Sequence, residues 1–118
     1  MYREGNLTLM VTNLKRSIRF YSEVLGLKQG NTIGEEWAEI DAPNLRIGLH
    51  PTQEKLNTSL IKNSMSIGLR VDDLDAAMEV LKNRGVTFLP LFQDQGAKIA
   101  PFYDPDGYPL YLIELKYG

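Results

Sequence analysis

Hydrophobic residues along the chain follow two spacings, which alternate in the same order in each half. Apolar side chains recur at every second position in residues 7–11 and 67–71, which predicts two strands. After each of these segments they recur at every third or fourth position, which predicts a helix with one buried stripe. Residues 7–26 and 67–85 align at an offset of 60 residues. The sequence therefore contains two copies of one structural unit.

Both predicted helices have suitable residues at their ends. Asn13 and Asp73 directly follow the two predicted strands, and their side chains can accept hydrogen bonds from the free amides of a first helical turn. Gly26 and Gly85 follow the last apolar position of each helix. A glycine there is typical of a helix that ends at a residue with positive φ.

Three short runs of β character follow each predicted helix. In the first copy these runs are residues 27–33, 36–41 and 45–50. In the second copy they are residues 86–92, 98–103 and 108–115. The order βαβββ therefore occurs twice, which places the protein in the α+β class.

We interpret the chain as a single domain, residues 1–118, built from two modules. A length of 118 residues leaves no room for a second domain of ordinary size. The first module covers about residues 5–50 and the second about residues 65–118. Residues 51–64 are polar and begin with Pro51, so we interpret them as a connector.

The composition excludes several kinds of site. The chain has no cysteine, which excludes disulfides, thiolate metal sites and thiol nucleophiles. His50 is the only histidine, so a metal site that takes two histidines from one chain is also excluded. The motifs of phosphate-binding loops, hydrolase nucleophile elbows, zinc proteases and dinucleotide-binding folds are all missing from the sequence.

Charge and hydropathy exclude two classes of partner. With 13 basic and 15 acidic residues the net charge is -2, so we expect no nucleic-acid partner. No apolar run approaches the roughly 20 residues that cross a bilayer. The first ten residues also lack the basic and then apolar layout of a secretion signal. We therefore expect a cytoplasmic protein without a membrane partner.

Four short motifs together resemble the vicinal oxygen chelate superfamily, which includes glyoxalase I, bleomycin-resistance proteins and extradiol dioxygenases. The motifs are Val11-Thr12-Asn13-Leu14, Phe20-Tyr21, Leu25-Gly26-Leu27 and Asp104-Pro105-Asp106-Gly107. The resemblance covers nearly the whole chain. It implies that tandem βαβββ modules form a U-shaped incomplete barrel, with helices on the convex side and the ligand or metal in the cup. It does not imply one particular activity.

The resemblance also implies where a divalent metal would be bound. Family members that chelate use four positions, which usually hold His or Gln, Glu, His and Glu. By alignment these positions are Asn6, Gly48, Ser66 and Tyr111. They provide neither a carboxylate nor an imidazole, so we predict no metal ion and no other cofactor. Glyoxalase I and ring-cleaving dioxygenase activities, which need the ion, are disfavoured for the same reason.

Alternation within the predicted strands assigns Met10, Arg46, His50, Arg70, Tyr111 and Ile113 to the cup, and it leaves the face of Trp37 and Glu39 open. The candidates for ligand binding are four apolar or aromatic residues and two arginines: Met10, Trp37, Tyr103, Tyr111, Arg46 and Arg70. The first four can form a polarizable wall for a flat ligand, and the arginines can bind a carboxylate of that ligand. The alternatives are core or dimer contacts for the aromatic residues and a solvated position for the arginines.

His50 is the candidate catalytic residue, because a histidine changes charge near neutral pH. In one interpretation it is a general base or, together with Glu39, a metal ligand. In the other it is a polar residue at a strand end, just before Pro51.

The remaining acidic residues are assigned structural roles. We expect Glu39 and Glu114 at solvated strand edges. Asp104 is expected to accept backbone hydrogen bonds in a tight turn, for which Gly107 supplies the positive φ. A calcium loop would need further oxygen ligands over about twelve residues.

The sequence therefore predicts a homodimer that binds a small organic molecule in the cup without a metal. Bleomycin-resistance proteins, which sequester a drug without chemistry, are the working example that the resemblance provides. The alternative is a glyoxalase-like lyase or isomerase that uses His50 as a base or metal ligand. Its activity would titrate near neutral pH and disappear in His50→Ala. A third possibility is an interaction domain whose cavity is filled.

Overall fold

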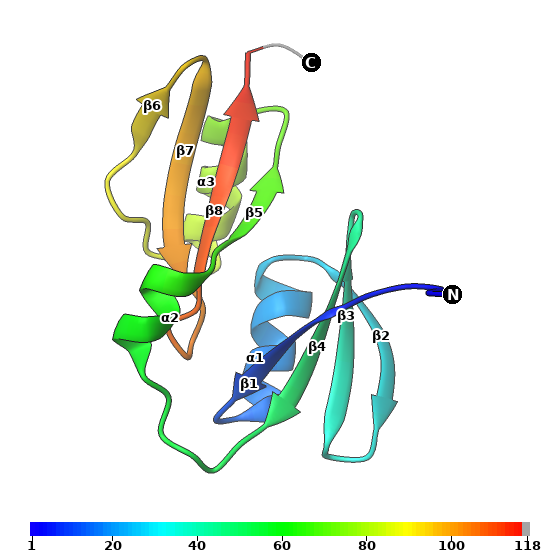
Figure 1. Cartoon of the computed structure of the whole chain (residues 1–118). Coiled ribbons are helices and arrows are strands. Elements are labelled where there is room, and N and C mark those ends of the chain that lie inside the picture. The colour runs from blue at the N-terminus through cyan, green and yellow to red at the C-terminus, as the bar shows by residue number, and fades with distance from the viewer. Residues whose placement is uncertain (117–118) are drawn as a thin grey trace. The chain divides into compact units, whose positions relative to one another are not determined.

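The first half of the chain forms a four-stranded sheet with a helix against one face. The computed structural model describes residues 1–116, and their elements group into two units, Met1–Leu56 and a second that begins at Asn57. The elements of the first unit are β1 (Leu7–Val11), α1 (Leu14–Arg19), the π-helical turn η1 (Phe20–Val24), β2 (Lys28–Ile33), β3 (Trp37–Ala42) and β4 (Leu45–Pro51). The sheet order is β1-β4-β3-β2, with β1 parallel to β4 and the other pairs antiparallel (Figure 1).

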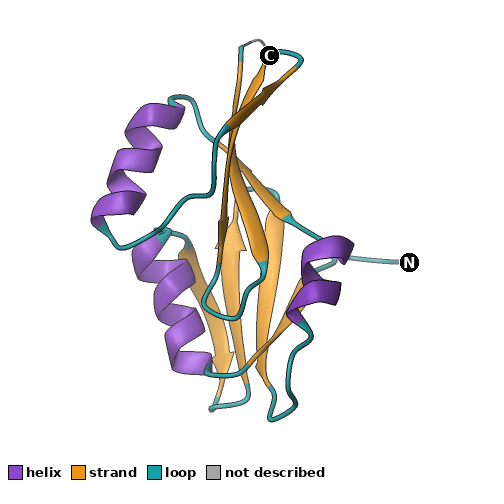
Figure 2. Ribbon diagram, turned by 90° about the vertical axis from the view of Figure 1, so that its left-hand side faces the viewer, coloured by secondary structure: helices purple, strands orange, loops and turns teal. Residues whose placement is uncertain are grey.

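The second unit repeats this arrangement and adds one short helix in front of it. Its elements are α2 (Thr58–Ser64), β5 (Ile67–Arg70), α3 (Leu74–Asn83), β6 (Phe92–Asp94), β7 (Ala97–Tyr103) and β8 (Pro109–Leu115). The order β5-β8-β7-β6 again has one parallel pair, β5 with β8. The helices α1 and α3 each lie along one face of their own sheet (Figure 2). The α+β class and the twofold βαβββ order predicted from the sequence are confirmed.

The predicted helix ends are confirmed as well. The Oδ1 atoms of Asn13 and Asp73 accept hydrogen bonds from backbone amides three residues later, at 3.1 and 3.0 Å. Gly26 and Gly85 have φ values of 77° and 97°, which favour glycine. The longest helix, α3, has ten residues. Within residues 1–116 no helix combines the length and the apolar character needed to span a membrane.

The structure differs from the prediction in two segments. Most of the run 86–92 is irregular, and β6 begins only at Phe92. Pro90 interrupts this run, since a proline lacks the amide that a sheet ladder requires. In the connector 51–64, residues from Thr58 onward form α2, whose N-terminus is capped by the side chain of Asn57. None of the residues of α2 is buried, so the helix lacks the apolar stripe from which a sequence predicts a helix.

The core of each unit lies between the helix and the sheet. In the first unit it contains Leu9, Val11, Tyr21, Ile40, Ile47 and Leu49. In the second unit it contains Ile67, Leu74, Met78, Phe102, Leu110 and Leu112. The faces predicted from alternation in the strands are therefore the faces observed.

Ser17 is a polar residue in the first core, and its replacement by alanine is expected to stabilise the protein. The side chain is fully buried on α1 and its Oγ has no hydrogen-bond partner. The aligned position in the second copy is Ala77. We expect Ser17→Ala to raise the free energy of unfolding by ~1 kcal/mol, because a desolvated hydroxyl without a partner is unfavourable. Urea unfolding measures this change.

Ser22→Ala is the matched control. The Ser22 hydroxyl donates to the carbonyl oxygen of Ile18 at 2.6 Å in a partly buried environment. Removing it is therefore expected to leave the protein unchanged or slightly less stable. A loss of stability in Ser17→Ala as large as in the control would contradict the interpretation.

A tight turn joins β7 to β8, as the sequence predicts. The Oδ1 atom of Asp104 accepts hydrogen bonds from the backbone amides of Asp106 and Tyr108, both at 2.9 Å. Gly107 has φ 91°, and its amide donates to the Asp104 carbonyl at 3.0 Å. Asp104 is only 5% exposed, so its carboxylate is part of the framework of the turn.

Candidate functional site

Each sheet has one face against its helix and one face turned away from it, which we call the open face. In the first sheet Ala38, Ile40, Ile47 and Leu49 are buried against the helix. Because neighbouring residues of a strand alternate between faces, the residues between them belong to the open face. Together with their partners in β1 and β2, these are Thr8, Met10, Lys28, Ile33, Trp37, Glu39, Asp41, Arg46, Gly48 and His50. Sequence alternation placed Met10, Arg46 and His50 here, and the register now adds Trp37 and Glu39.

The indole of Trp37 covers Gly48 on this open face. A Cβ atom built on Gly48 would lie 2.6 Å from Cζ2 and 2.8 Å from Cζ3 of the indole, and closer still to Cη2. Real Cβ atoms do not approach other atoms so closely, so the ring occupies the space of a side chain at position 48. Gly48 is buried for this reason although it lies on the open face, whereas Trp37 is half-buried. The rest of the indole is thus available for contact.

Arg46 is engaged by carboxylates of its own unit. Its guanidinium lies 2.9 Å from Glu4 and 3.3 Å from both Glu39 and Asp41. The charges of Glu4 and then of Glu39 raise the pKa of Arg46 above its ordinary value. A carboxylate of a ligand would therefore compete with three carboxylates already present. The side chain of Glu39 is only 17% exposed, which corrects the expectation of a solvated edge residue.

His50 lies exposed at the end of β4. Its Nδ1 is 2.8 Å from the carbonyl oxygen of Pro51, which accepts a hydrogen bond when Nδ1 carries the proton. Nε2 then keeps its lone pair. On the open face the neighbour of His50 in β1 is Met10, while Glu39 is opposite Gly48. This arrangement matches the prediction of a polar residue at a strand end, and it gives His50 no carboxylate directly opposite.

The side chains at the implied metal positions do not fit a divalent ion. Asn6 donates from Nδ2 to the hydroxyl of Thr8 at 3.0 Å. Gly48 lacks a side chain, and the indole fills the space where one would be. Ser66 and Tyr111 offer only neutral oxygens. Throughout residues 1–116 the His, Cys, Asp and Glu side chains form no group of three or more that could hold a metal ion.

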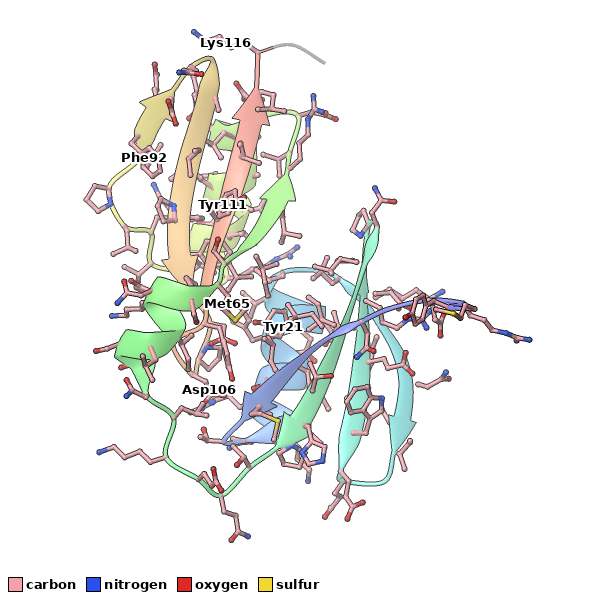
Figure 3. The ribbon with its side chains drawn as sticks, in the orientation of Figure 1. Tyr21, Met65, Phe92, Asp106, Tyr111 and Lys116 are labelled. Carbon is pink, nitrogen blue, oxygen red and sulfur yellow. The ribbon has the colours of Figure 1, made fainter. Side chains whose placement is uncertain are left out.

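The open face of the second sheet is more apolar. Residues directly opposite one another in the strand register share this face. They are Gly68, Arg70, Phe92, Asp94, Ala97, Ile99, Pro101, Tyr103, Pro109, Tyr111, Ile113 and Leu115. Tyr111 is near the middle of β8, and Phe92 comes from the edge strand β6 (Figure 3). The predicted residues Arg70, Tyr103 and Tyr111 therefore share one face.

The prediction from sequence omitted two apolar members of this face, Ile99 and Phe92, whereas alternation had already placed Ile113 here. Ile99 and Ile113 are directly opposite each other in β7 and β8, and Phe92 is opposite Ile99. Alternation along residues 97–103 would have assigned Ile99 to this face, had its parity been taken from the buried Ala100 and Phe102. Phe92 has no such signal, because the edge strand β6 contains only three residues.

Tyr111 and Tyr103 differ in what covers their rings. The phenol of Tyr111 covers Gly68, where a built Cβ would lie 2.6 Å from the ring carbon Cε2. Tyr103 is 36% exposed, and the Nζ of Lys62 from α2 lies 4.7 Å from its ring centroid. This cation–π contact gives Tyr103 a partner within its own unit.

An aromatic ring over a strand glycine thus occurs in both sheets. Gly48 pairs with Thr8 across β4 and β1, and Gly68 pairs with Tyr111 across β5 and β8. Both glycines therefore lie in the parallel strand pair of their sheet. A glycine within a strand commonly marks the close approach of another group, and here that group is an aromatic ring.

Glu114 serves the second helix. Its Oε1 accepts a hydrogen bond from the backbone amide of Leu74 at 2.8 Å, at the first turn of α3. Lys98 lies 4.0 Å from the other oxygen. The expectation of a solvated edge position is therefore wrong, because the free amides at a helix N-terminus favour a carboxylate. Glu114 points away from the open face, because it alternates with Ile113 along β8.

The sequence matches one family model over most of its length. The model is described as Glyoxalase/Bleomycin resistance protein/Dioxygenase superfamily, and it matches residues 5–112. The match includes the aligned positions Asn6, Gly48, Ser66 and Tyr111 and most residues of both open faces.

Solved structures share the fold over nearly the whole chain. UcmS2 is 27% identical, with a TM-score of 0.76 and coverage of 97% of this chain and 98% of that one. TnmS3, an antibiotic binding protein from Streptomyces sp. CB03234, is 21% identical, with a TM-score of 0.75 and coverage of 98% and 99%. Lactoylglutathione lyase from Agrobacterium tumefaciens is 14% identical, with a TM-score of 0.74 and coverage of 95% and 92%. At the lower identities the likeness concerns the fold alone.

Proposed function

Because the chain belongs to the glyoxalase/bleomycin resistance protein/dioxygenase superfamily, we propose that it binds a small organic molecule without a metal ion. The proposed ligand contacts come from the open faces. They are Met10, Trp37, Arg70, Tyr103 and Tyr111. We do not assign Arg46 to the ligand contacts, because its guanidinium forms ion pairs with Glu39 and Asp41 on the same face as Trp37. We propose in addition that the protein acts as a homodimer, as the family resemblance implies.

The observation that carries this proposal is the pair of aromatic rings at aligned metal positions. At Gly48 the indole of Trp37 fills the space of a side chain, and at Tyr111 a phenol covers Gly68. Burying aromatic surface against a ligand gains about 25 cal/mol of free energy per Å² of apolar area removed from water. An aromatic ring provides no donor atom for a cation such as Zn²⁺. Each open face is thus suited to contact carbon-rich molecules.

The known range of the fold is consistent with binding as the function. TnmS3 is described as an antibiotic binding protein, and its chain and this one cover each other almost completely. The fold also serves a lactoylglutathione lyase, so the fold does not choose between binding and catalysis. The side chains favour binding, because the only histidine is exposed and has no carboxylate directly opposite in the sheet.

A melting screen of the full chain tests the proposal. Protein purified without chelator is analysed for metals and melted with a library of small organic molecules, with and without EDTA. We expect far less than one divalent ion per chain and organic hits whose effect does not depend on EDTA. A ligand present at about 100 times its Kd raises the free energy of unfolding by about 2.7 kcal/mol, because it binds the native state only. One tightly held ion per chain would contradict the proposal, and a screen without any organic hit would favour an interaction domain.

The variant Arg70→Ala tests whether Arg70 contributes to ligand binding or to the stability of the fold. Arg70 is exposed at the end of β5 and shares the open face with Tyr111 and Ile113. We expect the variant to bind the hits of the screen more weakly while its melting temperature without ligand stays near that of the wild type. Equal losses of binding and of stability would assign Arg70 to the framework.

A further inference from the structure

We infer that the ligand presents a planar ring system without negative charge to Trp37, and that Gly48 determines this specificity by leaving room for the indole. The inference rests on the proposed function, since it names the class of molecule bound at the same face. Three features of the first unit support it: the position of Gly48, the surroundings of Trp37, and the recurrence of the arrangement in the second unit.

Gly48 has an unusual position for a glycine. It lies in the middle of β4, with Thr8 opposite on one side and Glu39 on the other. A glycine in a strand interior weakens the sheet, because it costs more backbone entropy than other residues and has no side chain to pack. Gly48 makes no use of positive φ, so its one observable consequence is the close approach of the indole. The glycine therefore serves the position of Trp37.

The indole is placed where it can contact a ligand. Trp37 is half-buried with its six-membered ring against Gly48, and the same face carries Met10, which is 39% exposed. Aromatic rings pair with other rings in offset or edge-to-face arrangements and gain energy beyond the area buried. A planar ring system uses this contact better than a saturated one of equal size.

The charges near the indole argue against an anionic ligand. Arg46 is already held by Glu4, Glu39 and Asp41, so the cation that would attract an anion has its partners. One arginine against three carboxylates leaves an excess of negative charge, which disfavours an anion further. For a ligand without negative charge, the apolar and aromatic surface of Trp37 is available.

The second unit contains the same arrangement, built from different residues. There the ring of Tyr111 covers Gly68. Tyr111 is itself the residue opposite Gly68 in the strand register. Trp37 instead lies two residues before Glu39, which is the residue opposite Gly48 in β3. The two units thus reach the same result, an aromatic ring over a strand glycine, with rings from different strand positions. This supports the view that the position of the ring is the feature that matters.

The test uses two probes of equal carbon skeleton, 2-naphthol and decahydro-2-naphthol, on the full chain. Trp37 is the only tryptophan, so the indole N–H signal in an NMR titration reports on this site alone. We expect 2-naphthol to shift the signal in a saturable manner and to bind about 2- to 10-fold more tightly than the saturated analogue. The affinity of the analogue is measured by calorimetry.

Three variants locate the effect. Gly48→Ala forces the indole away from β4. We expect the affinities for 2-naphthol and for decahydro-2-naphthol to fall to a similar value, and the Trp37 N–H signal to show no saturable shift. Trp37→Leu removes the ring without crowding β4, and we expect calorimetry to show the same loss of preference. Gly5→Ala is the matched control, because a Cβ at Gly5 would meet nothing within 4 Å. It is expected to bind both probes as the wild type does.

Failure of the inference and failure of the proposed function give different results. Equal affinities for the two probes in the wild type, or a preference for 2-naphthol that survives in Trp37→Leu, would overturn the inference while leaving ligand binding intact. The same holds if neither probe binds but other organic molecules stabilise the protein. If no organic molecule stabilises it at all, the proposed function itself is wrong.

Discussion

Replacing Phe102 with alanine is expected to lower the free energy of unfolding by about 3–5 kcal/mol, the range for an aromatic residue removed from a core. Phe102 is fully buried in β7 on the face that packs against α3. Its ring makes an edge-to-face contact with Phe88, with centroids 5.3 Å apart. Its neighbour in the sheet, Leu110, is also buried, so the surrounding residues cannot collapse fully into the space. Urea unfolding followed by circular dichroism measures the loss.

Tyr103→Ala is the matched control for this prediction, since it removes an aromatic ring from the next position of the same strand. Tyr103 lies on the open face and is 36% exposed. Its one ring contact described above, with Lys62, is worth roughly 0.5–1 kcal/mol at an exposed site. We therefore expect a loss of ~1 kcal/mol. Similar losses in both variants would mean that the two faces of the second sheet are not distinct in burial.

The sequence was sufficient to predict the two modules because their signals are local and repeated. Alternation at residues 7–11 and 67–71 fixed the faces of the first strand of each copy, and the observed burial of Leu9, Val11 and Ile67 agrees. The helix ends followed from side chains that accept hydrogen bonds and from glycines with positive φ, both of which act within a few residues.

Elements without a buried side were not predictable in the same way. The edge strand β6 has three exposed residues, and α2 has no buried residue. Hydrophobic periodicity records burial, so a segment that buries nothing carries no periodic signal. The connector helix and the irregular segment before Phe92 therefore appeared only in the structure.

The details of the candidate site depend on contacts between residues distant in sequence. Alternation places Gly48 on the open face, but it left the face of Trp37 unassigned and does not tell which neighbour the indole covers. The ion pair of Arg46 with Glu4 joins residues 42 positions apart, and no local pattern marks it. From the sequence, Arg46 was a candidate for binding a ligand carboxylate or a solvated residue, whereas the structure shows it held by carboxylates of its own unit.

Asp104→Ala is expected to destabilise the protein by about 2–4 kcal/mol, although it removes a side chain from a turn. Its Oδ1 is the acceptor for two backbone amides, those of Asp106 and Tyr108. A buried donor without a partner costs about 1–3 kcal/mol, and the hydrogen bond from Tyr108 is buried. The turn also sets where β8 begins at Pro109, and with it the alignment of Tyr111 with Gly68. Urea unfolding measures the loss.

Asp104→Asn distinguishes hydrogen bonding from charge in this turn. Asparagine keeps an Oδ1 acceptor at the same position but loses the negative charge, and hydrogen bonds to a charged acceptor are roughly twice as strong as neutral ones. We therefore expect Asp104→Asn to lose less than half as much stability as Asp104→Ala. If asparagine is as damaging as alanine, the charge itself stabilises the turn and the two amides are not the main partners. If neither variant loses stability, the turn is held by Gly107 and the strands alone, and β8 keeps its register without Asp104.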